Sequence, residues 1–149
     1  MKKFLFFIMC FVCITASAQT QVIENNQVPQ SINAFVDKWF PNRTEVTYLV
    51  EYDFGLVDEY EVRFSNGTVI EFNKHGHLKS VECAKGDTIN KDMLPSAIKS
   101  YLNLYHSNVK VKEYSIDNYS RRYIEYEVEL ENGISINFNK KFKVIEIDY

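Results

Sequence analysis

Hydrophobic and polar residues follow the same order in two stretches of the chain that lie 66 residues apart. Each stretch opens with apolar residues at the spacing of one helical face. They are Ile32, Phe35, Val36 and Trp39 in the first stretch, and Ile98, Tyr101, Leu102 and Tyr105 in the second. Pro29 and Pro95 stand just before these runs, where a helix tolerates proline. The pattern predicts one short helix at the start of each stretch.

After each helix the hydrophobic residues recur at every second position, which is typical of strands that bury one face. The predicted strands of the first stretch lie at 46–51, 59–64, 70–72 and 78–83. Those of the second lie around 114–116, 126–130, 136–138 and 145–149. Asn66-Gly67 and Asn132-Gly133 occupy equivalent positions between two strands, and Asn-Gly favours a tight hairpin turn.

These elements predict an α+β fold of two tandem repeats, each a helix followed by a four-stranded antiparallel meander, with the helices on one sheet face. The repeats cover residues 19–84 and 92–149, and residues 85–91 link them. One repeat alone would bury a marginal core, so we expect both to pack as one structural unit. The sequence leaves open whether the two sheets join, how the repeats are oriented, and the oligomeric state.

Residues 1–18 have the features of a Sec signal peptide that is cleaved. Lys2 and Lys3 precede an apolar run from Phe4 to Ile14, and Ala16-Ser17-Ala18 resembles a cleavage site. The run is shorter than the ~20 residues that span a bilayer. We therefore expect a periplasmic or secreted protein without membrane insertion after cleavage.

Net charge and cysteine content disfavour some classes of function. Cleavage would remove two lysines and no acid, so the net charge changes from −3 to −5. An acidic chain is a poor candidate for nucleic-acid binding, which needs clustered positive charge. Of the three cysteines only Cys83 would remain, so no internal disulfide is possible. We interpret Cys83 as a small apolar core residue, with an intermolecular disulfide or a reactive thiol as alternatives.

Short motifs shared by both stretches carry a family resemblance. Tyr-Glu-Val, Asn-Gly and Ile-x-Phe-Asn-Lys follow one another at 60–74 and again at 126–140. With the signal-like start, they resemble the PepSY-like, β-lactamase-inhibitor-like periplasmic proteins of Bacteroidetes-type bacteria. The resemblance implies a concave sheet that grips an enzyme or restrains a protease. The chain departs from the β-lactamase inhibitor protein itself, whose disulfides a single Cys83 cannot supply.

The outward-facing side chains of the predicted strands form our candidate binding face. Its residues are Glu59, Glu61, Arg63, Tyr123, Glu125, Glu127 and Glu129. Glu51, Glu71, Glu113 and Asp117 fall on the same outward faces. Such a surface would dock a basic partner by charge complementarity. The alternative is an ordinary solvated face that prevents aggregation.

Other candidate chemistry is weaker. The carboxylates of Glu59 and Glu61 could hold a calcium ion, but the sequence indicates nothing that encloses them. His75 and His77 flank a turn and lack a third ligand, so we predict no metal site. Thr88 lies in an Asp-Thr-Ile segment that resembles an O-glycosylation site.

No nucleophile–base pair or phosphate loop is evident, so we predict no catalytic residues and no cofactor. The sequence therefore favours a non-catalytic exported protein that binds a protein partner, such as an envelope enzyme or protease, through its open sheet face. The alternative is a periplasmic module that binds a small molecule or an ion.

Overall fold

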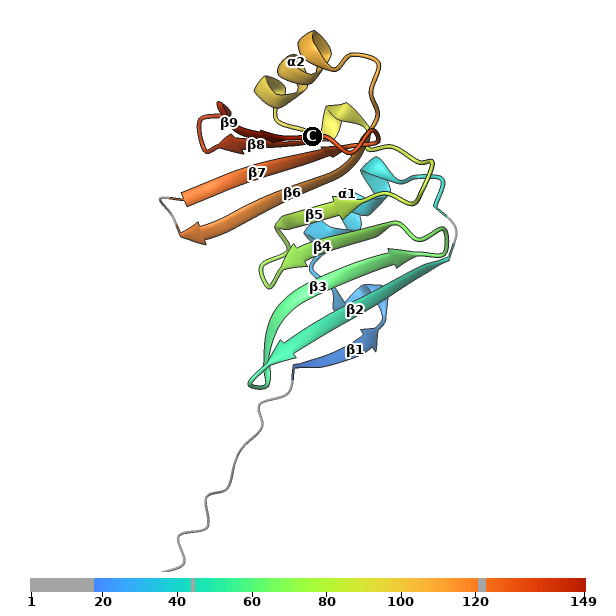
Figure 1. Ribbon diagram of the computed structural model, residues 1–149. Helices are drawn as coiled ribbons and strands as arrows, with labels where there is room; N and C mark the ends of the chain where they lie inside the picture. The colour runs from blue at the N-terminus through green and yellow to red at the C-terminus, as the bar shows by residue number, and fades with distance from the viewer. Residues whose placement is uncertain (1–17, 44, 121–122) are drawn as a thin grey trace, which may run out of the picture.

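One antiparallel sheet organises the molecule. The computed structural model describes residues 18–43, 45–120 and 123–149. Within these residues nine strands follow one another in sequence order across the sheet, from β1 at one edge to β9 at the other (Figure 1). The strands are β1 (Gln19–Ile23), β2 (Val46–Asp53), β3 (Leu56–Phe64), β4 (Val69–Asn73), β5 (Leu78–Glu82), β6 (Val111–Ser120), β7 (Tyr123–Leu130), β8 (Ser135–Asn139) and β9 (Val144–Asp148).

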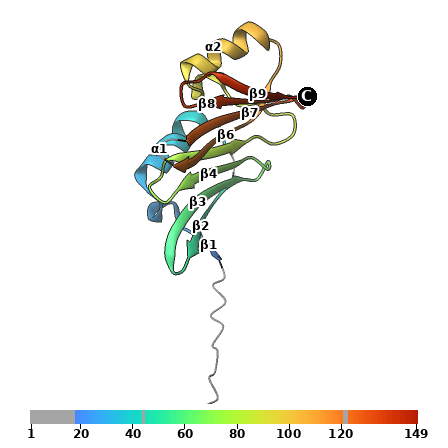
Figure 2. The ribbon, with the colours of Figure 1, turned by 60° about the vertical axis from the view of Figure 1, so that its left-hand side comes forward.

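Two short α-helices cover one face of this sheet (Figures 1 and 2). They are α1 (Gln30–Trp39) and α2 (Ser96–Tyr105), each preceded by a 3-10 turn, η1 (Asn25–Gln27) or η2 (Lys91–Met93). Ile32 and Ile98 are completely buried. The ring of Phe35 packs edge-on against Phe72 at 5.4 Å, and the ring of Tyr101 packs against Phe138 at the same distance. The core therefore lies between the helices and one side of the sheet, and the other side is left open.

The predicted fold class, two repeats of a helix and a four-stranded meander, is wrong. The described strands form a single nine-stranded sheet with only two short helices over it. β5 and β6 join the two predicted meanders through the antiparallel pairs Ser80↔Ser115, Val81↔Tyr114 and Glu82↔Glu113. Pairing two adjacent edges satisfies backbone groups that would otherwise be exposed, which is the physical reason for one sheet rather than two.

The ninth strand, β1, was absent from the sequence prediction. Its residues Gln-Thr-Gln-Val-Ile lack the alternation of a half-buried strand. β1 nevertheless pairs along β2, from Gln19↔Tyr52 to Ile23↔Tyr48. Backbone pairing along the free edge of β2 thus outweighs a weak side-chain pattern.

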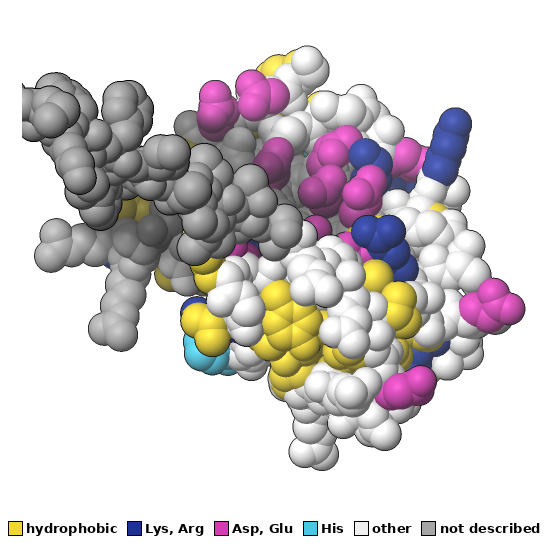
Figure 3. All heavy atoms as spheres, turned by 90° about the horizontal axis from the view of Figure 1, so that it is seen from below, with side chains coloured by type: hydrophobic (Ala, Val, Ile, Leu, Met, Phe, Trp, Pro, Cys, Tyr) yellow, Lys and Arg dark blue, Asp and Glu magenta, His cyan; other side chains and the backbone are white. Residues whose placement is uncertain are grey.

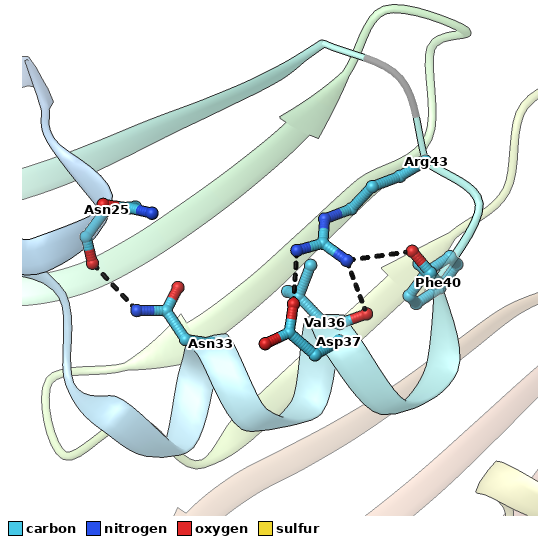
Figure 4. A network of polar contacts seen from close by, with 6 residues as sticks. All are labelled: Asn25, Asn33, Val36, Asp37, Phe40 and Arg43. Atoms are coloured by element: carbon cyan, nitrogen blue, oxygen red, sulfur yellow. Dashed lines mark hydrogen bonds and ion pairs between the residues drawn. The ribbon is translucent and has the colours of Figure 1, made fainter.

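Polar contacts fasten α1 to its surroundings (Figure 4). The Arg43 guanidinium follows the helix, pairs with Asp37, and donates from Nη1 to the Phe40 carbonyl at 3.1 Å. A cation there satisfies free carbonyls at the negative end of the helix dipole. At the other side, Asn33 Nδ2 donates to the Asn25 carbonyl at 2.8 Å, which ties α1 to η1.

Candidate functional site

The predicted binding residues lie on the sheet face opposite the helices, which we call the open face. Glu59, Glu61 and Arg63 come from β3, where they alternate with the buried Val62 and Phe64. Tyr123, Glu125, Glu127 and Glu129 come from β7. Three strands separate β3 from β7 in the sheet. At a strand spacing of about 4.8 Å, the two groups lie about 19 Å apart rather than in one cluster.

Carboxylates on neighbouring strands of the open face stand directly opposite one another. These cross-strand pairs are Glu51↔Glu59, Glu61↔Glu71, Glu82↔Glu113, Glu113↔Glu129 and Asp117↔Glu125. Figure 3, viewed from the β1 end, shows acidic side chains gathered in one area with a few Lys and Arg side chains among them. Like charges directly opposite each other destabilise a sheet. The open face therefore carries an electrostatic cost that a mixed-charge surface would avoid.

Cations offset part of this charge. Lys79 pairs with Glu59, Arg63 pairs with Glu61, and Lys112 Nζ lies 3.1 Å from Glu129 Oε1. The hydrogen bond to Glu129 raises the pKa of the Lys112 ammonium. All three cations are substantially exposed, so each pair contributes little to stability.

Our sequence prediction missed Lys79, Lys112 and Glu82 as members of the open face. Irregular pairing occurs between Glu71 and Phe72 opposite β5, and between Val111 and Glu113 on β6. A bulge adds a residue to one strand and changes which side chains face outward. Strict alternation in the sequence cannot locate such a shift, which explains why Lys79 and Lys112 were missed. Glu82 alternates regularly with the buried Val81 and Cys83, so the same pattern could have identified it.

Glu113 sits at the centre of the open face, between Glu82 on β5 and Glu129 on β7. Burial raises the pKa of the Glu113 carboxyl, and the neighbouring Glu82 and Glu129 raise it further. This is the point where the two halves of the sheet meet, so the like charges concentrate at the junction.

A surface hollow of about 690 Å³ lies at one end of this junction. Open-face residues Glu82, Lys112 and Glu129 line it together with the exposed loop around Lys85 and Asp87. It is bounded by loops and carries both signs of charge, unlike an enclosed pocket with converging polar groups. Among the described residues, no group of three or more His, Cys, Asp or Glu is placed to hold a metal ion.

The remaining predicted residues lie elsewhere. Cys83 is 5% exposed on the helix side, as predicted for a core residue, and burial raises the pKa of its thiol to about 11. Thr88 is an exposed loop residue, and its hydroxyl donates a hydrogen bond to the Val111 carbonyl oxygen at 3.1 Å. The rings of His75 and His77 are 6.3 Å apart. The predicted signal peptide falls almost entirely outside the described residues and stays a prediction.

Comparison with known proteins identifies the family. Residues 58–146 match the family model described as "Putative beta-lactamase-inhibitor-like, PepSY-like". The chain belongs to the PepSY-like family. This confirms the resemblance found in the sequence motifs. No match was found among functionally curated proteins.

Three solved structures resemble this PepSY-like protein. One is a "putative periplasmic protein" of the DUF2874 family from Bacteroides vulgatus, with 32% identity and a TM-score of 0.77 over 87% of this chain and 97% of that one. A "putative calcium-regulated periplasmic protein" from Bacteroides thetaiotaomicron shares 31% identity, with the same TM-score and coverage. A third, of unknown function and from Bacteroides vulgatus, shares 22% identity at a TM-score of 0.74 over 88% of this chain and 100% of that one, and supports the fold alone.

These relatives also bear on location. All three are described as periplasmic, and the prediction of a periplasmic or secreted protein is confirmed. Within the described residues, neither helix is long and apolar enough to cross a membrane.

Proposed function

We propose that this PepSY-like protein is a non-catalytic binding protein that captures a protein partner on its open face. The observation that carries the proposal is the set of cross-strand carboxylate pairs on a sheet face that no described helix covers. A face needed only for solubility would intersperse both signs of charge. A basic partner surface would relieve the repulsion between opposed carboxylates on binding. An envelope enzyme or a protease with a basic rim is the partner we expect, with inhibition as the consequence of capture.

Charge reversal tests this proposal. The variant Glu125→Lys/Glu127→Lys changes the second half of the open face, and Asp37→Lys/Asp92→Lys gives the same charge change on α1 and η2. The side chains of Asp37 and Asp92 are 66% and 60% exposed, and each has one surface ion pair of little energetic weight. Tagged protein would be cross-linked in periplasmic extract, and any partner purified for titration.

We expect one partner to be recovered by the native protein and the control variant, with affinity for the open-face variant lower by about tenfold or more. A partner that binds all three proteins equally would contradict the open-face assignment. Recovery of no partner by any of them would contradict protein capture.

Ion binding is a second candidate, favoured by the description of one relative as calcium-regulated. The open face offers oxygen ligands of the type that Ca²⁺ takes. Because the described carboxylates do not converge in threes, binding would require side chains to move together. Thermal unfolding with and without calcium chloride checks this, with magnesium chloride as the control. An equal change in unfolding temperature with both salts, or no change, would contradict a calcium site.

A further inference from the structure

No described strand pairs with the outer edge of β9, although the equivalent edge 66 residues earlier, that of β5, is paired. β5 pairs with β4 on one side and with β6 on the other. β9 pairs with β8, and no described strand lies on its other side. The internal β5–β6 junction therefore shows that β5, the equivalent of β9, accepts an antiparallel strand on its outer side. In that junction the Cys83 amide donates to the Lys112 carbonyl at 3.0 Å. Tyr149 occupies the equivalent position.

The helix side of this edge exposes hydrophobic groups. Cys83 is 5% exposed, whereas Tyr149 is 95% exposed. Leu104 and Tyr105 on α2 are 72% and 64% exposed. The Tyr105 ring lies 4.8 Å from the Tyr101 ring. Burial raises the pKa of the Tyr101 hydroxyl, and Tyr105 and Tyr149 raise it further. Tyr149 at the end of β9, together with Leu104 and Tyr105 of α2, therefore leaves apolar surface exposed on the helix side of the sheet.

The open-face side of the same edge is acidic. Glu146 and Asp148 are exposed, and neither forms an ion pair with another described residue. The cation that neutralises Glu59 in the first half, Lys79, is replaced at the equivalent position by Ile145. An added strand would thus meet negative charge on one side and apolar surface on the other.

A second copy of the chain fits this edge poorly. Antiparallel pairing of β9 with itself about Ile147 would set Glu146 opposite Asp148, which is unfavourable. The other free edge, β1, has the sequence Gln-Thr-Gln-Val-Ile and offers no cation. Neither edge of the sheet complements the charge of β9.

We propose that the free edge of β9 binds an extended segment of a partner protein as an added antiparallel strand. The segment alternates Lys or Arg with apolar residues. Its cations face Glu146 and Asp148, and its apolar residues pack beside Tyr149 and Tyr105. Strand addition of this kind draws affinity from main-chain hydrogen bonds and specificity from alternate side chains. The inference goes beyond the proposed function, because it requires the backbone of β9 rather than the carboxylates of β3 and β7.

Designed peptides test this inference without a known partner. The probes are the fluorescent peptide Lys-Val-Lys-Val-Lys-Val-Lys, a peptide of the same composition with its lysines in one block, and Glu-Val-Glu-Val-Glu-Val-Glu. Binding is measured by anisotropy, and its place by amide hydrogen exchange. We expect the alternating basic peptide to bind more tightly than the block peptide and to protect amides of residues 144–149. Equal binding of both basic peptides, or protection elsewhere, would overturn the proposal.

Two variant pairs separate backbone from charge. Tyr149→Pro removes both the ring and the amide donor, while Tyr149→Ala removes the ring alone, so we expect the proline variant to bind more weakly. Glu146→Lys/Asp148→Lys should weaken binding by about tenfold and transfer preference to the acidic peptide. Glu125→Lys/Glu127→Lys should have the smaller effect, which distinguishes this edge from the open face. Equal effects of the two charge reversals would contradict the assignment. So would a dimer that sedimentation detects without peptide and that Glu146→Lys/Asp148→Lys abolishes.

Discussion

The two halves of the sheet present different charge on the same side. In the first half Glu59 and Glu61 each have a cation, Lys79 and Arg63. At the equivalent positions of the second half stand Ile145 and Glu129. Glu129 itself pairs with Lys112, and among the described residues Glu127 accepts a hydrogen bond from the Ser135 hydroxyl and has no ion pair. The comparison teaches that a common backbone arrangement can carry two halves whose described acidic side chains are neutralised to different degrees.

The halves also differ in how they end. β5 is covered on its far side by β6, and Cys83 just beyond it is buried. β9 pairs with β8 but has no described strand on its outer side, and Tyr149 is almost fully exposed. The position within the sheet, rather than the local sequence pattern, thus decides whether these residues form core or surface.

Truncating the buried helix residues should have the largest effect on stability. Ile32→Ala and Ile98→Ala each remove a completely buried side chain, and each should lower the free energy of unfolding by about 2–5 kcal/mol. Because β5 and β6 join the halves, we expect one cooperative transition in urea for both variants. Leu104→Ala, at a 72% exposed position, is the control and should change little. Two separate transitions would show that the halves unfold independently.

A thiol at the buried end of β5 should react more slowly than one at the exposed end of β9. With a pKa of about 11, Cys83 should react with a thiol reagent at pH 8 roughly 200-fold more slowly than an exposed thiol of pKa about 8.5, because a smaller fraction of it is thiolate. The matched variant Cys83→Ala/Tyr149→Cys should react at the rate of a free thiol. Rapid modification of native Cys83 would contradict its burial under the helix layer.

A side chain at Gly76 should destabilise the protein, although Phe142 occupies the equivalent position 66 residues later. Gly76 has φ +74°, and an added Cβ would meet Ser31 Oγ and lie 3.0 Å from Pro29 Cβ. At the equivalent position Phe142 adopts φ 58° and packs against Tyr126. Gly76→Ala should cost roughly 1–3 kcal/mol in thermal or urea unfolding. Gly55→Ala, also at positive φ but with nothing within 4 Å, should cost less. Equal losses would mean that crowding against α1 is unimportant.

Neutralising the junction carboxylate should stabilise the protein slightly. The pKa of Glu113 is raised in the folded state by burial, Glu82 and Glu129, so its ionisation lowers stability as pH rises through that raised value. Glu113→Gln should therefore stabilise at pH 7, by less than about 1 kcal/mol, and the gain should shrink as the pH falls and native Glu113 becomes protonated. Thermal unfolding from pH 3 to pH 8 measures this. Glu131→Gln is the control, and a pH-independent gain would contradict the electrostatic explanation.

Local patterns predicted much of the element layout. The helical spacing of Ile32 to Trp39 and of Ile98 to Tyr105 matches α1 and α2, and the two Asn-Gly turns lie between β3 and β4 and between β7 and β8. Alternation also assigned Glu59, Glu61 and Arg63 to the outward side of β3 correctly. The interpretation of the 66-residue correspondence as a tandem duplication stays a prediction, as do protein binding and the modification of Thr88.

By itself, the sequence determined the family, the helices and most strands, because motifs, helical periodicity and turn residues act over a few neighbouring positions. Only the tertiary structure decided that the strands form one sheet, that β1 adds a strand beside β2, and that Lys79 and Lys112 reach the open face. These features depend on backbone hydrogen bonds between distant segments and on bulges that shift the register. Such pairing satisfies the backbone of whichever edge is available, so side-chain patterns within one segment do not encode it.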